Sequence, residues 1–270
     1  GDTADTLCKL NYALRASGLR VGNTASAWQE ACINKKREWE EFKAIRYQNP
    51  AIYDDVWGAE VLTQPAAIKA ATDWARARDA VCFFDAGDVQ ANGFQVVEDD
   101  SLGRAFTETG ASYMGFAVSA LLATALSAEP FYGLAISGDG SFTMNPQVLI
   151  DGIAHGARGC ILVLDNRRMG AIAGLQLAQY GAECGTGDEV VVDYLAWARA
   201  VSGVEAFAGG ATPESLLQAL DRARGYDGLS LIHVPVYFGP DELGGLGAFG
   251  RWNVGNWCAD TQALRHGIGL

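Results

Sequence analysis

Several features that would mark a membrane, secreted or zinc-binding protein are missing from this sequence. None of its apolar runs approaches the roughly 18 residues that a membrane-spanning helix needs, and no signal peptide opens the chain. The six cysteines show no CxxC spacing, and Cys82 and Cys160 lie in apolar, strand-like runs. We therefore expect buried free thiols rather than disulfides or a zinc site, no membrane contact, and a cytoplasmic location.

Positive charge is also scarce. The chain has 20 Lys and Arg residues against 32 Asp and Glu residues, which gives a formal net charge of −12. Because nucleic acids require a basic protein surface, we expect no nucleic acid partner. The overall field of the protein could not hold a polyanionic ligand either. Such a ligand would need a metal ion together with backbone amides.

The sequence does contain an alternation of apolar strands with helical stretches, over a length that allows roughly one to two domains. This alternation is typical of an α/β fold with a doubly wound parallel sheet flanked by helices, in which ligands bind beyond the carboxyl ends of the strands. Asn145-Pro146 and Thr212-Pro213 each predict a helix start. The expected strands are 81–85, 134–137, 160–164, 204–207 and 229–236, and the expected helices are 64–78, 110–127, 146–157, 193–202 and 213–224.

The segments outside this alternation lie at the two ends of the chain. Residues 1–10 read as the end of a strand that enters a helix, and residues 25–46 as a charged amphipathic helix. Residues 48–64 carry turn residues and little periodicity, so we expect a linker there. The glycine-rich, aromatic stretch after Tyr237 is either a lid over a pocket or an arm that packs its tryptophans on the surface.

The segment with the clearest chemistry joins two of the expected strands. Strand 134–137 runs into Gly138-Asp139-Gly140-Ser141, and Asn166 ends the next strand about 25 residues later. Neighbouring parallel strands deliver Asp139 and Asn166 to one edge of the sheet, where a carboxylate and an amide oxygen suit Mg²⁺ with phosphate oxygens as its other ligands. The glycines allow close approach of the backbone, and a following helix N-terminus favours an anion. An acidic protein can hold a diphosphate in this way.

The run from Gly138 to Asn166, GDGSFTMNPQVLIDGIAHGARGCILVLDN, resembles the fingerprint of thiamine-diphosphate-dependent enzymes, and in particular their acetohydroxyacid synthase-like branch. The resemblance implies a thiamine diphosphate-binding fold in which Asp139, Asn166 and the main-chain carbonyl of Arg168 ligate Mg²⁺. It also implies that Met114 props the cofactor in its bent, catalytic conformation. The implied cofactor-binding residues are Gly87, Asp88, Val89, Met114, Gly138, Asp139, Gly140, Ser141, Asn166, Arg168, Met169 and Gly170.

Each of these signals has a plainer alternative. GDG by itself is a common strand–turn–helix corner, and Met114 by itself would more often be part of a core. The spacing from GDG to Asn166, the apolar strands on both sides and the position of Met114 together favour the cofactor interpretation.

The resemblance divides the chain into four parts. Residues 1–20 resemble the end of a central domain, 21–60 a helical linker, 61–238 the diphosphate-binding domain and 239–270 a C-terminal arm. No segment resembles the pyrimidine-binding domain, whose glutamate the family also needs. We therefore expect a fragment or one subunit of a split enzyme, with the pyrimidine-binding and central domains as partners. The family further implies a homo-oligomer (dimer or tetramer), and any FAD would be bound mainly by the central domain.

Within the branch, the sequence is most similar to the cyclic 1,2-dione hydrolases, which include trihydroxycyclohexanedione hydrolase and cyclohexane-1,2-dione hydrolase. The similarity rests on DAG at 85–87, SYMGFAVS at 112–119 and RWNVG at 251–255. It implies cleavage of a C–C bond next to a carbonyl, by hydrolytic ring opening of a cyclic 1,2-dione, with this chain supplying the diphosphate and Mg²⁺ half of the site.

Three alternatives stay open at this point. Arg167 and Arg168 follow Asn166 where acetohydroxyacid synthases show a different sequence, which leaves the substrate open between a 1,2-dicarbonyl and a 2-oxo acid. A 2-oxo acid decarboxylase and an acetohydroxyacid synthase-type carboligase are therefore alternatives within the fold. A non-catalytic diphosphate-binding subunit is an alternative of another class.

The remaining candidates for chemistry are the three histidines and one aspartate. His155 lies in an expected helix, His233 in an expected strand and His266 near the end of the chain. None carries a partner signal, so we expect structural roles. Asp165 precedes Asn166, and we expect it to support the loop rather than bind substrate.

Overall fold

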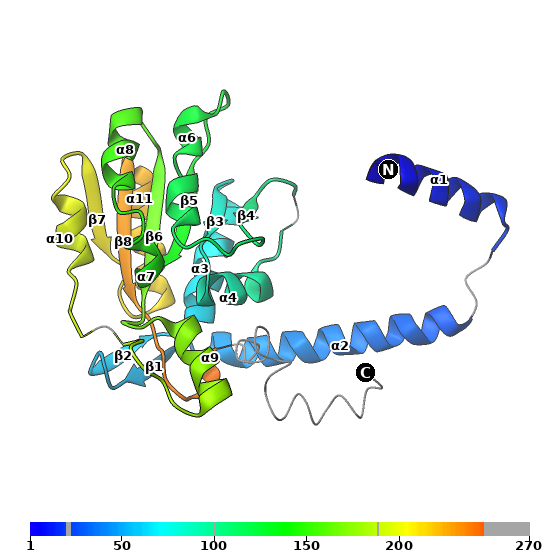
Figure 1. Cartoon of the computed structure of the whole chain (residues 1–270), viewed down its shortest axis with the longest axis horizontal. Helices are drawn as coiled ribbons and strands as arrows, with labels where there is room; N and C mark the ends of the chain where they lie inside the picture. Colours follow the sequence, from blue (N-terminus) through cyan, green and yellow to red (C-terminus); the bar gives the residue numbers. More distant parts are fainter. Residues whose placement is uncertain (20–22, 100, 188, 246–270) are drawn as a thin grey trace. The chain divides into compact units, whose positions relative to one another are not determined.

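The computed structural model describes residues 1–19, 23–99, 101–187 and 189–245. The chain divides into two compact units, Gly1–Ala44 and Ile45–Leu270. Figure 1 shows their helices and strands. Most of the expected C-terminal arm, including RWNVG, lies outside the described residues.

The N-terminal unit is helical. Helix α1 (Thr3–Ala16) begins after Asp2, whose side chain accepts a hydrogen bond from the Asp5 amide at 2.9 Å and so caps the helix. The expectation of a strand end within residues 1–10 is therefore wrong. Helix α2 (Asn23–Gln48) confirms the expected helix 25–46, extends it at both ends and continues into the second unit.

Six parallel strands form the main sheet of the second unit, in the order β4-β3-β5-β6-β8-β7. All five expected strands are present, and β4 is an additional edge strand. Parallel pairing throughout confirms the expected fold class. The strands are β3 (Val81–Phe84), β4 (Ala105–Thr107), β5 (Gly133–Gly138), β6 (Gly159–Asp165), β7 (Val204–Ala208) and β8 (Leu229–Pro235).

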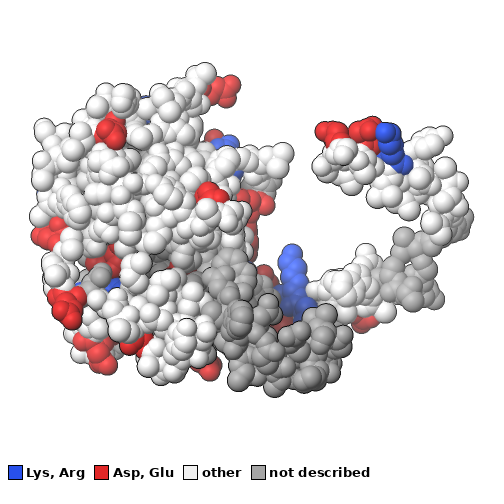
Figure 2. Space-filling view, viewed as in Figure 1, with Lys and Arg blue, Asp and Glu red and all other residues white. Residues whose placement is uncertain are grey.

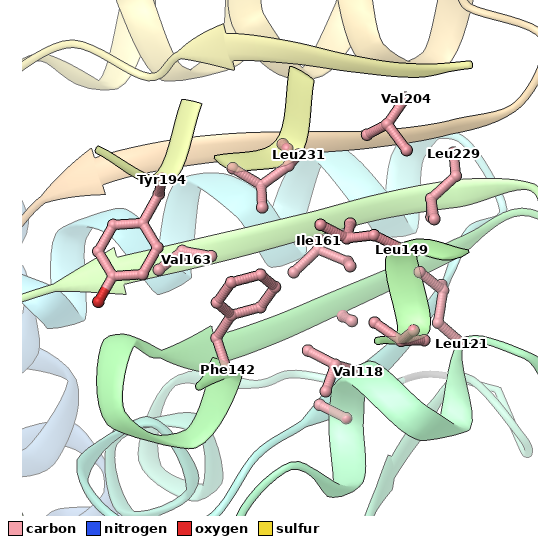
Figure 3. Close-up of a cluster of buried hydrophobic side chains, with 14 of the residues drawn as sticks. Val118, Leu121, Phe142, Leu149, Ile161, Val163, Tyr194, Val204, Leu229 and Leu231 are labelled. Carbon is pink, nitrogen blue, oxygen red and sulfur yellow. The ribbon is translucent and has the colours of Figure 1, made fainter. Parts of the chain in front are cut away.

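Helices cover both faces of this sheet, as a doubly wound topology requires. One face carries the core cluster of Figure 3, in which Phe142, Leu149 and Tyr194 from helices pack against Ile161 and Leu231 from strands. Alternate strand residues are buried on the other face. The first face holds α5 (Phe116–Ala120), α7 (Asp139–Phe142), α8 (Val148–His155) and α10 (Tyr194–Arg199), and the second α3 (Gln64–Ala77), α4 (Asp88–Val96) and α11 (Pro213–Gly225).

A short antiparallel hairpin replaces the linker expected at 48–64. Strands β1 (Ala51–Asp54) and β2 (Ala59–Leu62) pair along their whole length. Leu62 also forms a parallel bridge with Val236, and its carbonyl accepts a hydrogen bond from the Tyr237 amide at 2.8 Å. The hairpin is therefore joined to the segment that follows β8. This long-range contact is not encoded in the local periodicity of the sequence.

The single helix expected at 110–127 is wrong. Residues 110–115 form a loop, and only then do two short helices follow, α5 and α6 (Ala123–Leu126). Ser112 and Gly115 adopt left-handed backbone conformations, with φ of 53° and 90°. Residues in left-handed conformations cannot continue an α-helix. Helix α5 therefore begins only after Gly115.

One of the two expected helix caps is confirmed and the other is wrong. Thr212 forms a capping box with Ser215 at the start of α11. Asn145 caps no helix, because α8 begins at Val148. Its Nδ2 instead donates to Ser119 Oγ at 3.0 Å and to the Gly115 carbonyl at 3.3 Å, so Asn145 supports the loop that precedes α5.

Helices α4 and α9 (Gly170–Tyr180) were not expected from the sequence. Both contain glycines, which lower helix propensity, and neither has a side-chain cap. Gly93 in α4 has a tertiary reason, since a Cβ there would lie 2.7 Å from the Phe84 ring. The expected helix 193–202 is present as the shorter α10.

The thiols and the surface agree with the composition. Cys82 and Cys160 are buried and free, as expected, and burial raises the pKa of each thiol to about 12. Figure 2 shows acidic side chains scattered over the visible face and few basic ones. Within the described residues, no helix combines the length and the hydropathy needed to cross a membrane.

Candidate functional site

Three neighbouring strands, β3, β5 and β6, end at the same edge of the sheet. Their register pairs Phe84 with Ile136 and Gly138 with Leu164, so the turns that follow them lie beside one another. A cavity of about 200 Å³ lies at this edge, and all twelve residues expected to bind a cofactor line it. It is lined in addition by Gln64, Ala86, Gln90, Ser112, Leu164, Ala171, Ile172 and Leu175.

Asp139 and Asn166 are each oriented by a nearby backbone amide. The Gly140 amide donates to Asp139 Oδ1 at 2.9 Å, and the Arg168 amide donates to Asn166 Oδ1 at 3.0 Å. Both side chains are buried, with 4% and 9% of their surface exposed. The Arg168 carbonyl accepts a hydrogen bond from the Gly170 amide at 2.8 Å and keeps a second lone pair. These oxygens are hard donors of the kind that Mg²⁺ prefers.

Other kinds of metal site are not built here. Among the residues that the structure describes, no three His, Cys, Asp or Glu side chains gather as a metal-binding group. The oxygens of Asp139, Asn166 and Arg168 are too few to fill the coordination shell of a metal ion, so a metal ion at this edge would also need the phosphates of a ligand. The donor set fits Mg²⁺ bound with a diphosphate rather than a metal held by protein side chains alone.

Two glycines keep the wall of the cavity free of side chains. A Cβ at Gly140 would lie 2.7 Å from Met169 Sδ. A Cβ at Gly170 would lie 2.2 Å from Asp88 Oδ2 and 2.8 Å from Asn166 Nδ2. Neither glycine has a positive φ, so the requirement at both positions is space. This space lets backbone amides approach a diphosphate closely.

Met114 lies in the loop opposite the GDG turn. It is half-buried rather than part of the core, and its Cε lies 3.8 Å from the position that a Cβ at Gly140 would occupy. The Glu108 carboxylate holds the preceding turn by accepting hydrogen bonds from the Gly110, Ala111 and Tyr113 amides. The hydrogen bonds from these amides, led by Ala111, lower the pKa of Glu108. The Met114 side chain is thus carried by a braced loop.

Asp88 contributes a half-buried carboxyl to the cavity wall. Burial raises its pKa to about 7. At neutral pH this shift lowers the negative charge that a diphosphate would meet there.

Some of the additional wall residues could have been found from the sequence, and others could not. Ala86 and Ser112 adjoin expected residues in DAG and SYMG, so a wider window would have included them. Ile172 and Leu175 come from α9, the helix that the sequence did not predict. Gln64 leaves no local signal, because the packing of α3 beside α4 brings it to the cavity.

Asp165 and His233 are bonded to one another beside the loop that carries Asn166. Asp165 Oδ1 accepts a hydrogen bond from the Arg167 amide at 2.9 Å, and its Oδ2 lies 2.8 Å from His233 Nε2. Asp165 therefore holds the loop that carries Asn166. His155 is exposed on α8 and lines no part of the cavity, and His266 lies outside the described residues.

Comparison with known proteins identifies the region around the cavity. Residues 85–234 match the family described as thiamine pyrophosphate enzyme, C-terminal TPP binding domain. The chain is 25% identical over 273 aligned positions to the 3D-(3,5/4)-trihydroxycyclohexane-1,2-dione hydrolase of Listeria monocytogenes. The alignment covers 94% of this chain and 42% of that protein. The chain thus spans less than half the length of this curated relative.

Two solved structures share the fold. The thiamine diphosphate-dependent 4-hydroxybenzoylformate decarboxylase of Rhodococcus jostii aligns with a TM-score of 0.60 and 19% identity, over 67% of this chain and 34% of that one. The benzoylformate decarboxylase of Polynucleobacter necessarius aligns with a TM-score of 0.58 and 18% identity, over the same shares of the two chains. At these identities the likeness extends to the fold alone.

Proposed function

Because this chain belongs to the thiamine pyrophosphate enzymes, through their C-terminal TPP-binding domain, we propose that its cavity binds thiamine pyrophosphate together with Mg²⁺. This cofactor is also called thiamine diphosphate, the name used below. We further propose that the protein cleaves a C–C bond next to a carbonyl, by hydrolytic ring opening of a cyclic 1,2-dione. The name of the curated Listeria relative supports this substrate class.

One observation carries the proposal. The twelve residues that the sequence marked for the cofactor come from four separate segments, 87–89, 114, 138–141 and 166–170, and all of them line one cavity at the carboxyl edge of the sheet. Ligands of doubly wound α/β folds bind at this edge.

In the proposed complex, each segment has a distinct task. Asp139, Asn166 and the Arg168 carbonyl would hold Mg²⁺, which neutralises the diphosphate in a protein of negative net charge. Backbone amides of Gly140 and Ser141 would bind the phosphate oxygens. The bound cofactor supplies the electron sink for C–C cleavage. The contribution of this chain is to fix the cofactor in place.

The chain supplies the diphosphate half of the proposed site. The alignment covers 42% of the length of the curated relative. We propose that pyrimidine-binding and central domains of the same enzyme complete the site in a homodimer or homotetramer. The proposal is tested on the full-length protein that carries this chain.

The decisive experiment combines cofactor analysis with substrate tests. We expect the full-length protein to bind thiamine diphosphate in a Mg²⁺-dependent way and to open the ring of cyclohexane-1,2-dione. Decarboxylation or carboligation of 2-oxo acids without ring opening would contradict the proposed reaction. The protein would then be a 2-oxo acid decarboxylase or an acetohydroxyacid synthase-type carboligase. Cofactor binding without turnover of either class would support a non-catalytic subunit, and the absence of cofactor binding would reject the proposed function altogether.

Met114 offers a test of the cofactor role against a packing role. We expect Met114→Ala to lower turnover while the affinity for thiamine diphosphate and Mg²⁺ stays near that of the wild type. Because the side chain is half-buried, its truncation should cost less than the ~2–5 kcal/mol of a fully buried large-to-small change. Turnover, cofactor affinity and a thermal melt of the full-length protein measure the three quantities.

The matched control is Met144→Ala. Met144 is 52% exposed and lines no part of the cavity, so the same truncation should leave turnover unchanged. A large loss of stability in Met114→Ala, with normal specific activity of the folded fraction, would reject the role assigned to Met114.

A further inference from the structure

Asp85 directly follows β3, and none of the roles above involves it. Its side chain is fully buried, with 0% of its surface exposed, and it does not line the cavity. Burial of a carboxylate costs free energy unless its oxygens are hydrogen-bonded. The groups that bind Asp85 must therefore compensate for that cost.

These groups belong to three different segments of the cavity wall. Asp85 Oδ1 accepts hydrogen bonds from the Ala86 amide at 3.0 Å and from the Gly115 amide at 2.7 Å. Asp85 Oδ2 accepts one from Ser137 Oγ at 2.8 Å. Ala86 precedes Gly87, Gly115 follows Met114, and Ser137 precedes Gly138. One carboxylate thus joins the three turns behind the wall.

The bonding pattern satisfies both oxygens of Asp85. Two of its three partners are backbone N–H groups, which can only donate, and the third is the Ser137 hydroxyl, which can donate or accept. Burial raises the pKa of Asp85, and the hydrogen bonds from Ser137 and the backbone amides oppose that rise. All three contacts can persist in either protonation state, because a protonated Oδ2 could donate to the Ser137 hydroxyl while that hydroxyl donates to the Gly138 carbonyl at 3.2 Å.

The loop that carries Met114 needs such an anchor. Residues 110–115 form no helix or strand, and left-handed conformations at Ser112 and Gly115 interrupt any regular pattern. Glu108 holds the beginning of this loop from the surface. Asp85 holds its end from the interior and connects it to β5 through Ser137.

We propose that Asp85 is a positioning residue, which sets the distance between Met114 and the GDG turn and thereby the shape of the cofactor cavity. It does so without touching the cofactor. The inference rests on the proposed function, since it assigns Asp85 to the same cavity.

The first test measures cofactor affinity. Asp85→Ala removes all three hydrogen bonds, and we expect it to weaken the binding of thiamine diphosphate in saturating Mg²⁺ by about 10- to 100-fold, the usual effect of losing a supporting partner. Asp85→Asn keeps an acceptor for the Gly115 amide, so its loss should be smaller. Turnover at saturating cofactor should also fall, because Met114 would be displaced.

The matched control is a buried aspartate outside the cavity. Asp54 is 5% exposed, and its carboxylate accepts hydrogen bonds from the Val56, Trp57 and Phe238 amides. Asp54→Asn and Asp54→Ala should lower the melting temperature and leave cofactor affinity unchanged in the folded fraction. If Asp85→Ala does not fold, the cofactor affinities of Asp85→Asn and Asp54→Asn are compared instead. Only Asp85→Asn should bind the cofactor more weakly than the wild type.

The second test needs no cofactor. Amide hydrogen exchange in the cofactor-free, full-length protein should be at least about tenfold faster within residues 110–116 of the folded Asp85 variant, with exchange in β6 unchanged. Unchanged exchange in that segment, or wild-type cofactor affinity in the folded Asp85 variant, would overturn the inference. Failure of the wild type to bind thiamine diphosphate would instead overturn the proposed function, while the exchange result would still decide whether Asp85 holds the loop.

Discussion

Replacement of Asp139 by alanine is expected to weaken the binding of thiamine diphosphate in the presence of Mg²⁺ by more than about 100-fold. Loss of an outer-shell partner of a metal site costs roughly 10- to 100-fold, and Asp139 is proposed as a direct ligand and the only charged one. The protein has a net charge of −12, so no general positive potential would replace the missing metal ion. Titration of the full-length protein with cofactor at several Mg²⁺ concentrations measures the effect.

Asp139→Asn separates the charge of the side chain from its shape. The amide oxygen can still accept the hydrogen bond that the Gly140 amide now donates to Asp139 Oδ1. The turn should therefore keep its form, and the Mg²⁺ dependence should still be lost. Asp151→Ala, an exposed aspartate on α8, is the control and should bind the cofactor normally. Wild-type affinity in Asp139→Ala would remove Asp139 from the metal site.

Periodicity predicted the central part of the fold because its strands are continuous apolar runs. β5 and β6 are buried almost throughout, and such runs between helices are typical of parallel sheets. The β1–β2 hairpin was missed because its strands have four residues each and are completed by the bridge between Leu62 and Val236. Helix α9 was missed because glycine begins it and no side chain caps it.

The candidate site was predictable to the extent that it follows strand ends. Asp139 and Asn166 come directly after β5 and β6, and pairing of these strands makes them neighbours at the edge of the sheet. Asp85 and Gln64 are different. Asp85 contacts residues 30 and 52 positions away, and Gln64 reaches the cavity through the packing of helices. Such contacts leave no pattern in the local sequence, so only the folded chain reveals these residues.

The second large effect is expected at Gly170. Gly170→Ala should weaken cofactor binding by about 10-fold or more, because the new methyl group would lie 2.2 Å from Asp88 Oδ2 and 2.8 Å from Asn166 Nδ2. Both side chains would have to move, and a shift of about 1 Å in a positioned group can cost about 100-fold in activity. Cofactor titration and turnover of the full-length protein measure the two consequences.

The same substitution should not damage the fold, which makes it a sharp test of the site. Gly170 is the first residue of α9 and has no positive φ, and alanine favours a helix over glycine. Gly225→Ala, at the end of α11 with nothing within 4 Å of the added Cβ, is the matched control. Both variants should melt near the wild-type temperature, and only Gly170→Ala should lose the cofactor. If Gly170→Ala binds thiamine diphosphate as tightly as Gly225→Ala does, then Asn166 does not hold the metal ion in the way proposed.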